Sequence, residues 1–299
     1  GMSSPPAAPT PQGRPALLVL ALLSLYLIWG SSYLGAKIAL EGLPPLMVSG
    51  LRFYTAGTIL LPIAVAAGYP LPTLREFASA ALVGLFMMAI GNGALVISVQ
   101  YVASGLVAVG MASIPMWTAI FAGILYRWPG RMEWLALAVG LGGIVLLNLQ
   151  ADFRGNPVGA AAILVGALAW ALGTVLQQRL TIPQGLMAPA VEMVTAGIML
   201  LCTSFLWGER LMTFPGSRPL LAVLYLAVGP SVIAFSSHAY LLRQRVRAVV
   251  ANSFAYVNPV VAVVLGVTFG GETIHLHGLA AMAVIIVSLI MLGASRSKE

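Results

Sequence analysis

Two tryptophans, Trp29 and Trp170, stand near the middle of long apolar segments. Tryptophan in a membrane segment normally marks the headgroup interface, and an indole N–H deep in an apolar span needs a hydrogen-bond acceptor. The ring faces can stack on aromatic groups and attract quaternary cations. Both residues are therefore candidates for substrate contacts; the alternative is that they are bulky core residues whose N–H groups are satisfied.

Two prolines, Pro115 and Pro259, interrupt two further apolar segments. Each proline removes one helical hydrogen bond, so the freed carbonyl must find another donor. We predict a kinked hinge at each of them. The polar residues expected around the prolines are Ser113, Asn252, Tyr256 and Asn258, with Asn92 and His238 from the preceding segments.

His238 has three possible roles: a proton relay, a ligand contact, or a hydrogen-bonded packing residue. We favour contact or packing. Ser236 and Ser237 would add serine to this histidine in an intramembrane hydrolase, but adjacent residues on one helix do not face each other, and no arrangement of nucleophile, base and orienting group is evident. The sequence indicates neither an enzyme nor a cofactor.

The composition determines the class of protein that carries these residues. Hydrophobic residues make up 60% of the 299-residue chain and charged residues only 8%, which excludes an ordinary water-soluble surface. The net charge of +7 comes from basic residues at segment ends, which orient membrane helices rather than bind nucleic acid. We expect an all-α integral membrane protein with ten transmembrane helices, near residues 16–38, 45–67, 77–99, 103–126, 133–149, 157–179, 187–207, 219–242, 248–269 and 275–294.

An internal repeat divides the chain into halves. Gln100 and Pro115 recur 144 residues later as Gln244 and Pro259, which indicates duplication of a whole half. Thr-Ala-Gly also occurs in both halves, ending at Gly57 and at Gly197, and the two tryptophans match as well. We expect a disordered tail over 1–15 and five-helix repeats over 16–150 and 157–295. Because each repeat has an odd number of helices, the second must be inverted in the membrane.

The charged residues give the orientation. With the N-terminus in the cytoplasm most lysines and arginines fall in cytoplasmic loops, so both termini are expected there. Inversion then places Arg52 near the outer face and Glu192 near the inner one, too far apart to pair. Because an unpaired charge at membrane depth is costly, we expect Glu41 to pair with Arg52, and Arg179 with Glu192.

Several short motifs resemble the EamA branch of the drug/metabolite transporter superfamily. They are Trp29-Gly30-Ser31-Ser32-Tyr33, Arg52-Phe53, the two prolines and Gly271-Glu272. Within this branch the chain resembles YddG-type exporters of aromatic amino acids and methyl viologen. The resemblance implies a basket of ten helices around a central cavity, with substrate-binding positions at Trp29, Asn92, Met111, Trp170, His238 and Tyr256. Unlike sugar-phosphate relatives, the midplane segments contain no lysine or arginine, which argues against phosphorylated substrates.

We therefore expect a secondary exporter of the bacterial inner membrane that works by alternating access. Its partners would be a small amphipathic or aromatic substrate and the lipid bilayer, and it would function as a monomer. The alternatives are an amino-acid or drug exporter of broad specificity and, in another class, a channel or an intramembrane hydrolase.

Overall fold

A computed structural model describes residues 13–102, 104–149, 156–269 and 275–295. The expected disordered tail lies outside this part except for residues 13–15, and α1 already begins at Pro15. The Gly271-Glu272 motif also lies outside it. The described elements are helical: α1 (Pro15–Ala39), α2 (Pro45–Ala66), α3 (Leu74–Gly84), η1 (Leu85–Asn92), α4 (Gly93–Ser98), α5 (Ser104–Ala112), α6 (Ile114–Leu125), α7 (Arg131–Leu147), α8 (Pro157–Arg179), α9 (Met187–Leu206), α10 (Ser217–Ala227), η2 (Val228–Ile233), α11 (Ala234–Arg243), α12 (Ala248–Ala251), α13 (Phe254–Phe269) and α14 (Leu276–Ala294).

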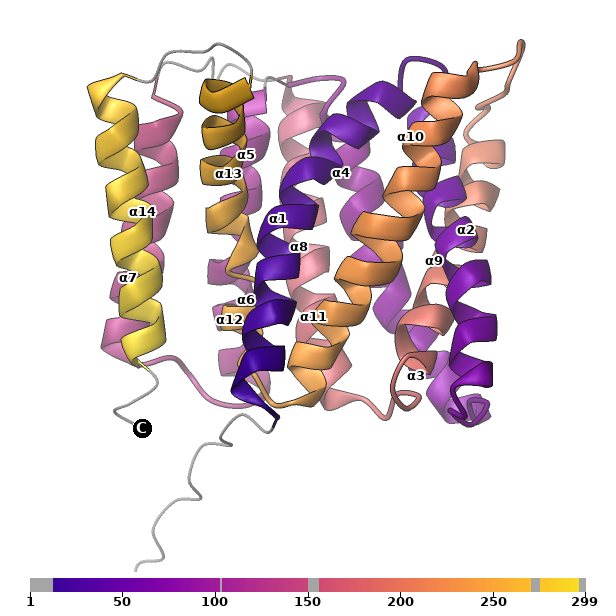
Figure 1. The fold of residues 1–299 in the computed structure, drawn as a ribbon, viewed down its shortest axis with the longest axis horizontal. Helices are drawn as coiled ribbons and strands as arrows, with labels where there is room; N and C mark the ends of the chain where they lie inside the picture. Colours follow the sequence, from indigo (N-terminus) through magenta and orange to yellow (C-terminus); the bar gives the residue numbers. More distant parts are fainter. Residues whose placement is uncertain (1–12, 103, 150–155, 270–274, 296–299) are drawn as a thin grey trace, which may run out of the picture.

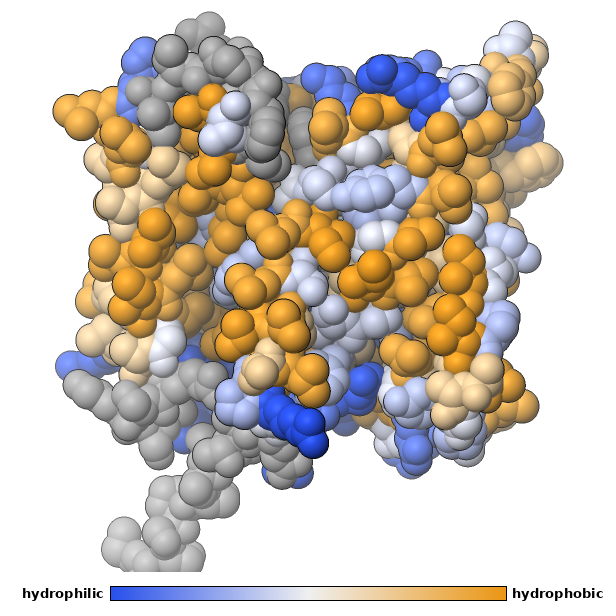
Figure 2. All heavy atoms as spheres, viewed as in Figure 1, coloured by the Kyte–Doolittle hydropathy of each residue, from blue (hydrophilic) through white to orange (hydrophobic). Residues whose placement is uncertain are grey.

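The helices stand side by side in one bundle (Figure 1), and hydrophobic side chains cover most of the middle of its visible face (Figure 2). Eight helices in the described residues are long and apolar enough to cross a membrane. The other two expected spans correspond to α7, which has 17 residues, and to the stretch of α12 and α13, which is interrupted between Ala251 and Phe254. Ten spans therefore remain a prediction.

Two of the long spans contain π-helical turns. The span over 74–98 runs from α3 through η1 to α4. The span over 217–243 runs from α10 through η2 to α11. The wider turn displaces side chains from the α-helical pattern and often occurs at functional sites. The sequence periodicity did not predict either segment.

Helix starts follow from local chemistry. Proline occupies the first turn of α1, α2 and α8, where its missing N–H costs nothing. At the start of α2 no side chain of its own caps the helix. Glu209, beyond the end of α9, does so instead: its carboxylate accepts from the backbone N–H groups of Leu46 and Met47 at 3.3 and 3.0 Å.

The closest packing between the two sequence halves joins α2 to α9. A Cβ added at Gly57 would lie 2.6 Å from the Val194 nitrogen, and one added at Gly197 would lie 2.7 Å from the Cα of Tyr54. From one contact to the other the residue number falls from 57 to 54 on α2 and rises from 194 to 197 on α9. The two helices are therefore antiparallel. Glycine permits this close approach of the two backbones.

The two predicted hinges have different surroundings. Pro115 lies in the first turn of α6, directly after the interruption at Ser113 that separates α5 from α6. Pro259 lies inside α13, and the neighbouring interruption falls earlier, at Asn252 and Ser253. A bending motion at either proline stays a prediction.

The α2–α9 crossing gives a stability test. Gly57→Ala should destabilise the protein by about 1–3 kcal/mol, the usual cost of overpacking, because its new methyl group would meet the Val194 backbone. Gly142 on α7 has no atom within 4 Å of an added Cβ, so Gly142→Ala should keep or raise the melting temperature, since alanine favours helix over glycine by roughly 1 kcal/mol. Thermal unfolding in detergent measures both; equal melting temperatures would contradict the packing argument.

Candidate substrate cavity

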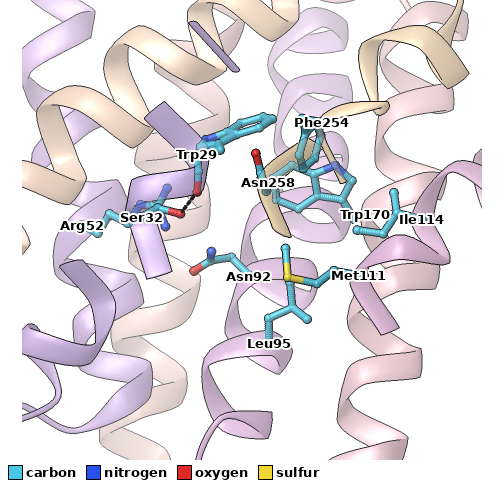
Figure 3. Close-up of a pocket in the computed structure, with 10 residues that line it drawn as sticks. All are labelled: Trp29, Ser32, Arg52, Asn92, Leu95, Met111, Ile114, Trp170, Phe254 and Asn258. Atoms are coloured by element: carbon cyan, nitrogen blue, oxygen red, sulfur yellow. Dashed lines mark hydrogen bonds between the residues drawn. The ribbon is translucent and has the colours of Figure 1, made fainter. Parts of the chain in front are cut away.

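A cavity of about 50 Å³ lies inside the helical bundle (Figure 3). Its wall combines aromatic, apolar and polar side chains from α1, α2, η1, α4, α5, α6, α8 and α13. The lining residues are Trp29, Ser32, Arg52, Asn92, Leu95, Met111, Ile114, Trp170, Phe254 and Asn258.

Trp29 forms the centre of an aromatic cluster that is part of this wall. Its ring lies edge-on to Phe254, with 4.5 Å between centroids, and edge-on to Trp170 at 5.3 Å. Its Nε1 donates to the carbonyl oxygen of Pro230 at 2.8 Å. The indole N–H that the sequence left in need of an acceptor is therefore satisfied, and the ring is held in one orientation.

Trp170 differs from Trp29 in one respect. Its side chain is also buried and lines the cavity, but its Nε1 has no hydrogen-bond partner among the described residues. A buried donor without an acceptor costs about 1–3 kcal/mol. The ring lines the cavity, but the Nε1 atom itself is fully buried.

Arg52 is a lining residue that the sequence analysis did not include. It is buried, with Nε donating to the hydroxyl of Ser231 at 2.7 Å and Nη2 donating to the carbonyl oxygen of Pro230 at 3.1 Å. The expected pairing with Glu41 was wrong, because Glu41 forms an ion pair with Arg218 at 3.3 Å. The sequence analysis noted that the midplane segments contain no lysine or arginine, but the long side chain of Arg52 extends from α2 to the cavity wall.

Ser231, a partner of Arg52, also compensates for a neighbouring proline. Pro230 in η2 has no N–H, so it cannot donate to the Leu226 carbonyl one turn earlier. The Ser231 hydroxyl donates to that carbonyl at 2.7 Å and at the same time accepts from Arg52. The freed backbone and the buried cation are thus satisfied through one serine.

The pairing expected for Glu192 was wrong as well. Arg179 stacks its guanidinium over the ring of Tyr126, 5.2 Å from the centroid. Glu192 is buried on α9, and its Oε2 has no hydrogen-bond partner in the described part of the chain.

His238 lies behind the aromatic cluster and does not line the cavity. Its Nε2 is 2.9 Å from the Asn252 Oδ1, and the Asn252 amide donates to the hydroxyls of Thr118 and Thr174 at 2.9 and 3.3 Å. All four residues are buried. This polar cluster joins α11, α6 and α8 through hydrogen bonds, which suits packing, one of the two roles favoured for His238.

The six sequence-predicted positions thus separate into two groups. Trp29, Asn92, Met111 and Trp170 lie together on the cavity wall. Tyr256 does not: it is buried against α7, where its hydroxyl donates to the Leu137 carbonyl at 3.0 Å. Whether any of the six binds substrate stays a prediction.

A simple signal could have found two of the missing wall residues. Helical residues three or four apart share a face. Ser32 follows Trp29 by three positions, and Leu95 follows Asn92 by three. Arg52 offered no such signal, because its contact with η2 depends on the packing of two distant segments.

The comparisons with known proteins agree with this architecture. The family model described as "EamA-like transporter family" matches the chain twice, over residues 16–149 and 157–294. The chain belongs to the EamA-like transporter family. Its relatives are transporters, so the hydrolase alternative is set aside.

Relatives of this EamA-like protein extend over nearly its whole length. It is 43% identical to a protein of Escherichia coli K12 described as an uncharacterized inner membrane transporter, YedA, over 91% of this chain and 89% of YedA. It is 23% identical to protein PagO of Salmonella typhimurium over 95% of each chain. A crystal structure that is 19% identical superposes with a TM-score of 0.77 over 96% of this chain and all of the other, which shows the fold alone. The chain is thus a multi-pass protein of the inner membrane.

The Arg52–Ser231 contact in this EamA-like protein can be tested by stability. Ser231→Ala removes the acceptor of Arg52 Nε and the donor to Leu226, so we expect a loss of about 1–3 kcal/mol. Ser237 lies in the same span and donates to the Ile233 carbonyl of its own helix at 2.9 Å, which makes Ser237→Ala the matched control with a smaller loss. Thermal unfolding in detergent distinguishes them, and a Ser231→Ala variant as stable as the control would contradict the role of Ser231.

Proposed function

We propose that this EamA-like protein is a secondary transporter that exports small amphipathic or aromatic metabolites, with aromatic amino acids as the first candidates. The observation that carries the proposal is the aromatic wall of the cavity, where Trp29, Trp170 and Phe254 lie together. Their faces and edges complement another aromatic ring, since aromatic pairs gain about 0.5–1.5 kcal/mol beyond area burial.

The size of the cavity supports alternating access. At about 50 Å³ it is far smaller than the roughly 300–1,000 Å³ of a typical ligand pocket. A metabolite therefore has room only after the surrounding helices move apart. Opening to one side and then to the other would load and release it, whereas a channel would need a continuous path. Counterflow that saturates with substrate concentration separates the two mechanisms.

We further propose ten spans arranged as two inverted five-helix repeats over 16–150 and 157–295. The antiparallel crossing of α2 and α9 supports this, because Gly57 meets Val194 while its counterpart Gly197 meets Tyr54. Such an exchange of equivalent contacts is expected around a twofold axis. The double family match has nearly the same boundaries.

The proposed orientation has both termini in the cytoplasm. The first residues of α1 and the last residues of α14 lie at the same end of the bundle (Figure 1). The working unit is a monomer, since one chain supplies the whole described wall of the cavity. An exporter of broader amino-acid or drug specificity is the second candidate, favoured by the flexible Met111 on the same wall.

Transport assays on two tryptophan variants test the site. Trp170→Ala should lower the export of an aromatic amino acid at least tenfold, because it removes a ring from the cavity wall. Trp207, at the end of α9, is 77% exposed, so Trp207→Ala should retain near wild-type transport. Initial rates in proteoliposomes with matched protein content give the comparison; equal losses in both variants would remove the assignment of the cavity as the site.

Cysteine labelling tests the orientation. In a Cys202→Ser background, a cysteine is introduced at Thr181, between α8 and α9, or at Thr213, between α9 and α10; both positions are exposed. A membrane-impermeant maleimide should label Thr213→Cys in intact cells, and Thr181→Cys only after permeabilisation. The reverse pattern would place the termini outside the cytoplasm.

A further inference from the structure

The cavity wall carries a positive charge, on Arg52, that no acidic side chain among the described residues neutralises. Arg52 donates to a serine hydroxyl and to a backbone carbonyl, and both acceptors are neutral. Among the described residues no carboxylate lies within the 4 Å of an ion pair to Arg52, and Glu41, its neighbour in sequence, pairs with Arg218. A buried cation with neutral partners is costly, and intramembrane charges of this kind commonly mark substrate pathways.

A further donor lies on the same wall. The Oδ1 of Asn92 already accepts from the Ser49 hydroxyl at 2.8 Å, so its amide NH₂ is the group left for a ligand. None of the lining residues is acidic. Donors and a cation without a carboxylate of the protein are the arrangement expected for an anionic ligand.

The charge is also at one side of the cavity. Figure 3 shows Arg52 and Ser32 on one side, and Ile114 and Trp170 on the other, with Asn92 and Met111 between them. The wall therefore has a cationic, hydrogen-bonding side and an apolar, aromatic side. A molecule that matches both must carry a negative group at one end and an apolar group at the other.

We infer that the cavity recognises a free carboxylate, with Arg52 as its ion-pair partner and the amide NH₂ of Asn92 as an additional donor. This inference rests on the proposed transport function and specifies the substrate class of the same site. Because the guanidinium uses only part of its N–H groups on Ser231 and Pro230, others remain for the carboxylate. A single cation suits a monoanion better than a phosphate dianion, and it repels dications such as methyl viologen.

Phenyl compounds with different head groups test the inference on the wild-type protein. The panel is phenylalanine, 3-phenylpropionate, phenylalanine methyl ester, phenethylamine and phenyl phosphate. We measure the thermal shift of the detergent-solubilised protein as a function of ligand concentration, and counterflow in proteoliposomes. The two free carboxylates should bind at least tenfold more tightly than the ester and the amine. Equal binding of acid and ester, or tighter binding of phenyl phosphate, would overturn the inference.

Variants of Arg52 provide the second arm. Arg52→Gln should remove the preference for 3-phenylpropionate over the ester, and Arg52→Lys, which keeps the charge, should retain part of it. If Arg52→Gln does not fold, the binding of acid and ester to Arg52→Lys and to the wild-type protein still tests the inference. An unchanged preference in Arg52→Lys and Arg52→Gln alike would overturn the role of Arg52.

The two readouts separate this inference from the proposed function. Carboxylate binding that depends on Arg52, without counterflow of phenylalanine, supports the inference and contradicts the proposed export of aromatic amino acids. Counterflow of phenylalanine and of its methyl ester at equal rates supports export and contradicts carboxylate recognition. Absence of both binding and counterflow contradicts both.

Discussion

A backbone carbonyl in an apolar interior must accept a hydrogen bond, and the Pro230 carbonyl is the acceptor on which the cavity wall depends. It accepts from Trp29 on α1 at 2.8 Å and from Arg52 on α2 at 3.1 Å. Two consecutive helices of the first half, α1 and α2, therefore meet η2 of the second half at one oxygen atom. The bond to Trp29 orients the ring that packs on Trp170 and Phe254, and the bond to Arg52 holds the cation at the cavity. The aromatic side and the charged side of the site thus have a common support.

Most of the helical framework could be predicted from the sequence, because bilayer thickness and helix-start chemistry act locally. The segments expected at 45–67, 157–179 and 187–207 agree within a residue with α2, α8 and α9. At α8 the reason is visible in the chain itself: the Asn156 side chain accepts from the Val158 N–H at 2.9 Å, and proline follows at the first helical position. The interruptions inside the spans are different: the break at Ser113 lies two residues before Pro115, where the sequence predicted a kink, whereas the sequence pattern did not predict η1 or the break at Asn252.

Residues of the cavity wall could be predicted where residue type and depth sufficed, and were missed where a partner from a distant segment decided the outcome. A tryptophan at the middle of an apolar span is unusual wherever it occurs, so Trp29 and Trp170 could be selected by inspection. Arg52 seemed to need an acidic partner, and the nearest one in sequence was Glu41. Its actual partners, the Ser231 hydroxyl and the Pro230 carbonyl, lie in η2, which is distant from Arg52 in the sequence. Tyr256 was assigned to the cavity by resemblance, yet it lies two positions from both Phe254 and Asn258 and therefore points away from their face, toward α7.

The buried charge also bears on how a closed cavity would behave during transport. Closing the helices around Arg52 removes water from a cation whose hydrogen-bond partners in the protein are neutral, which raises the free energy of the empty, closed state. A bound carboxylate supplies the missing charge and exchanges hydration for an ion pair in a region of low dielectric constant, where the attraction is stronger than in water. In the proposed cycle, substrate therefore stabilises the closed state more than the open ones. A ligand shifts a conformational equilibrium only by such a difference in affinity, and here Arg52 is the residue that creates it.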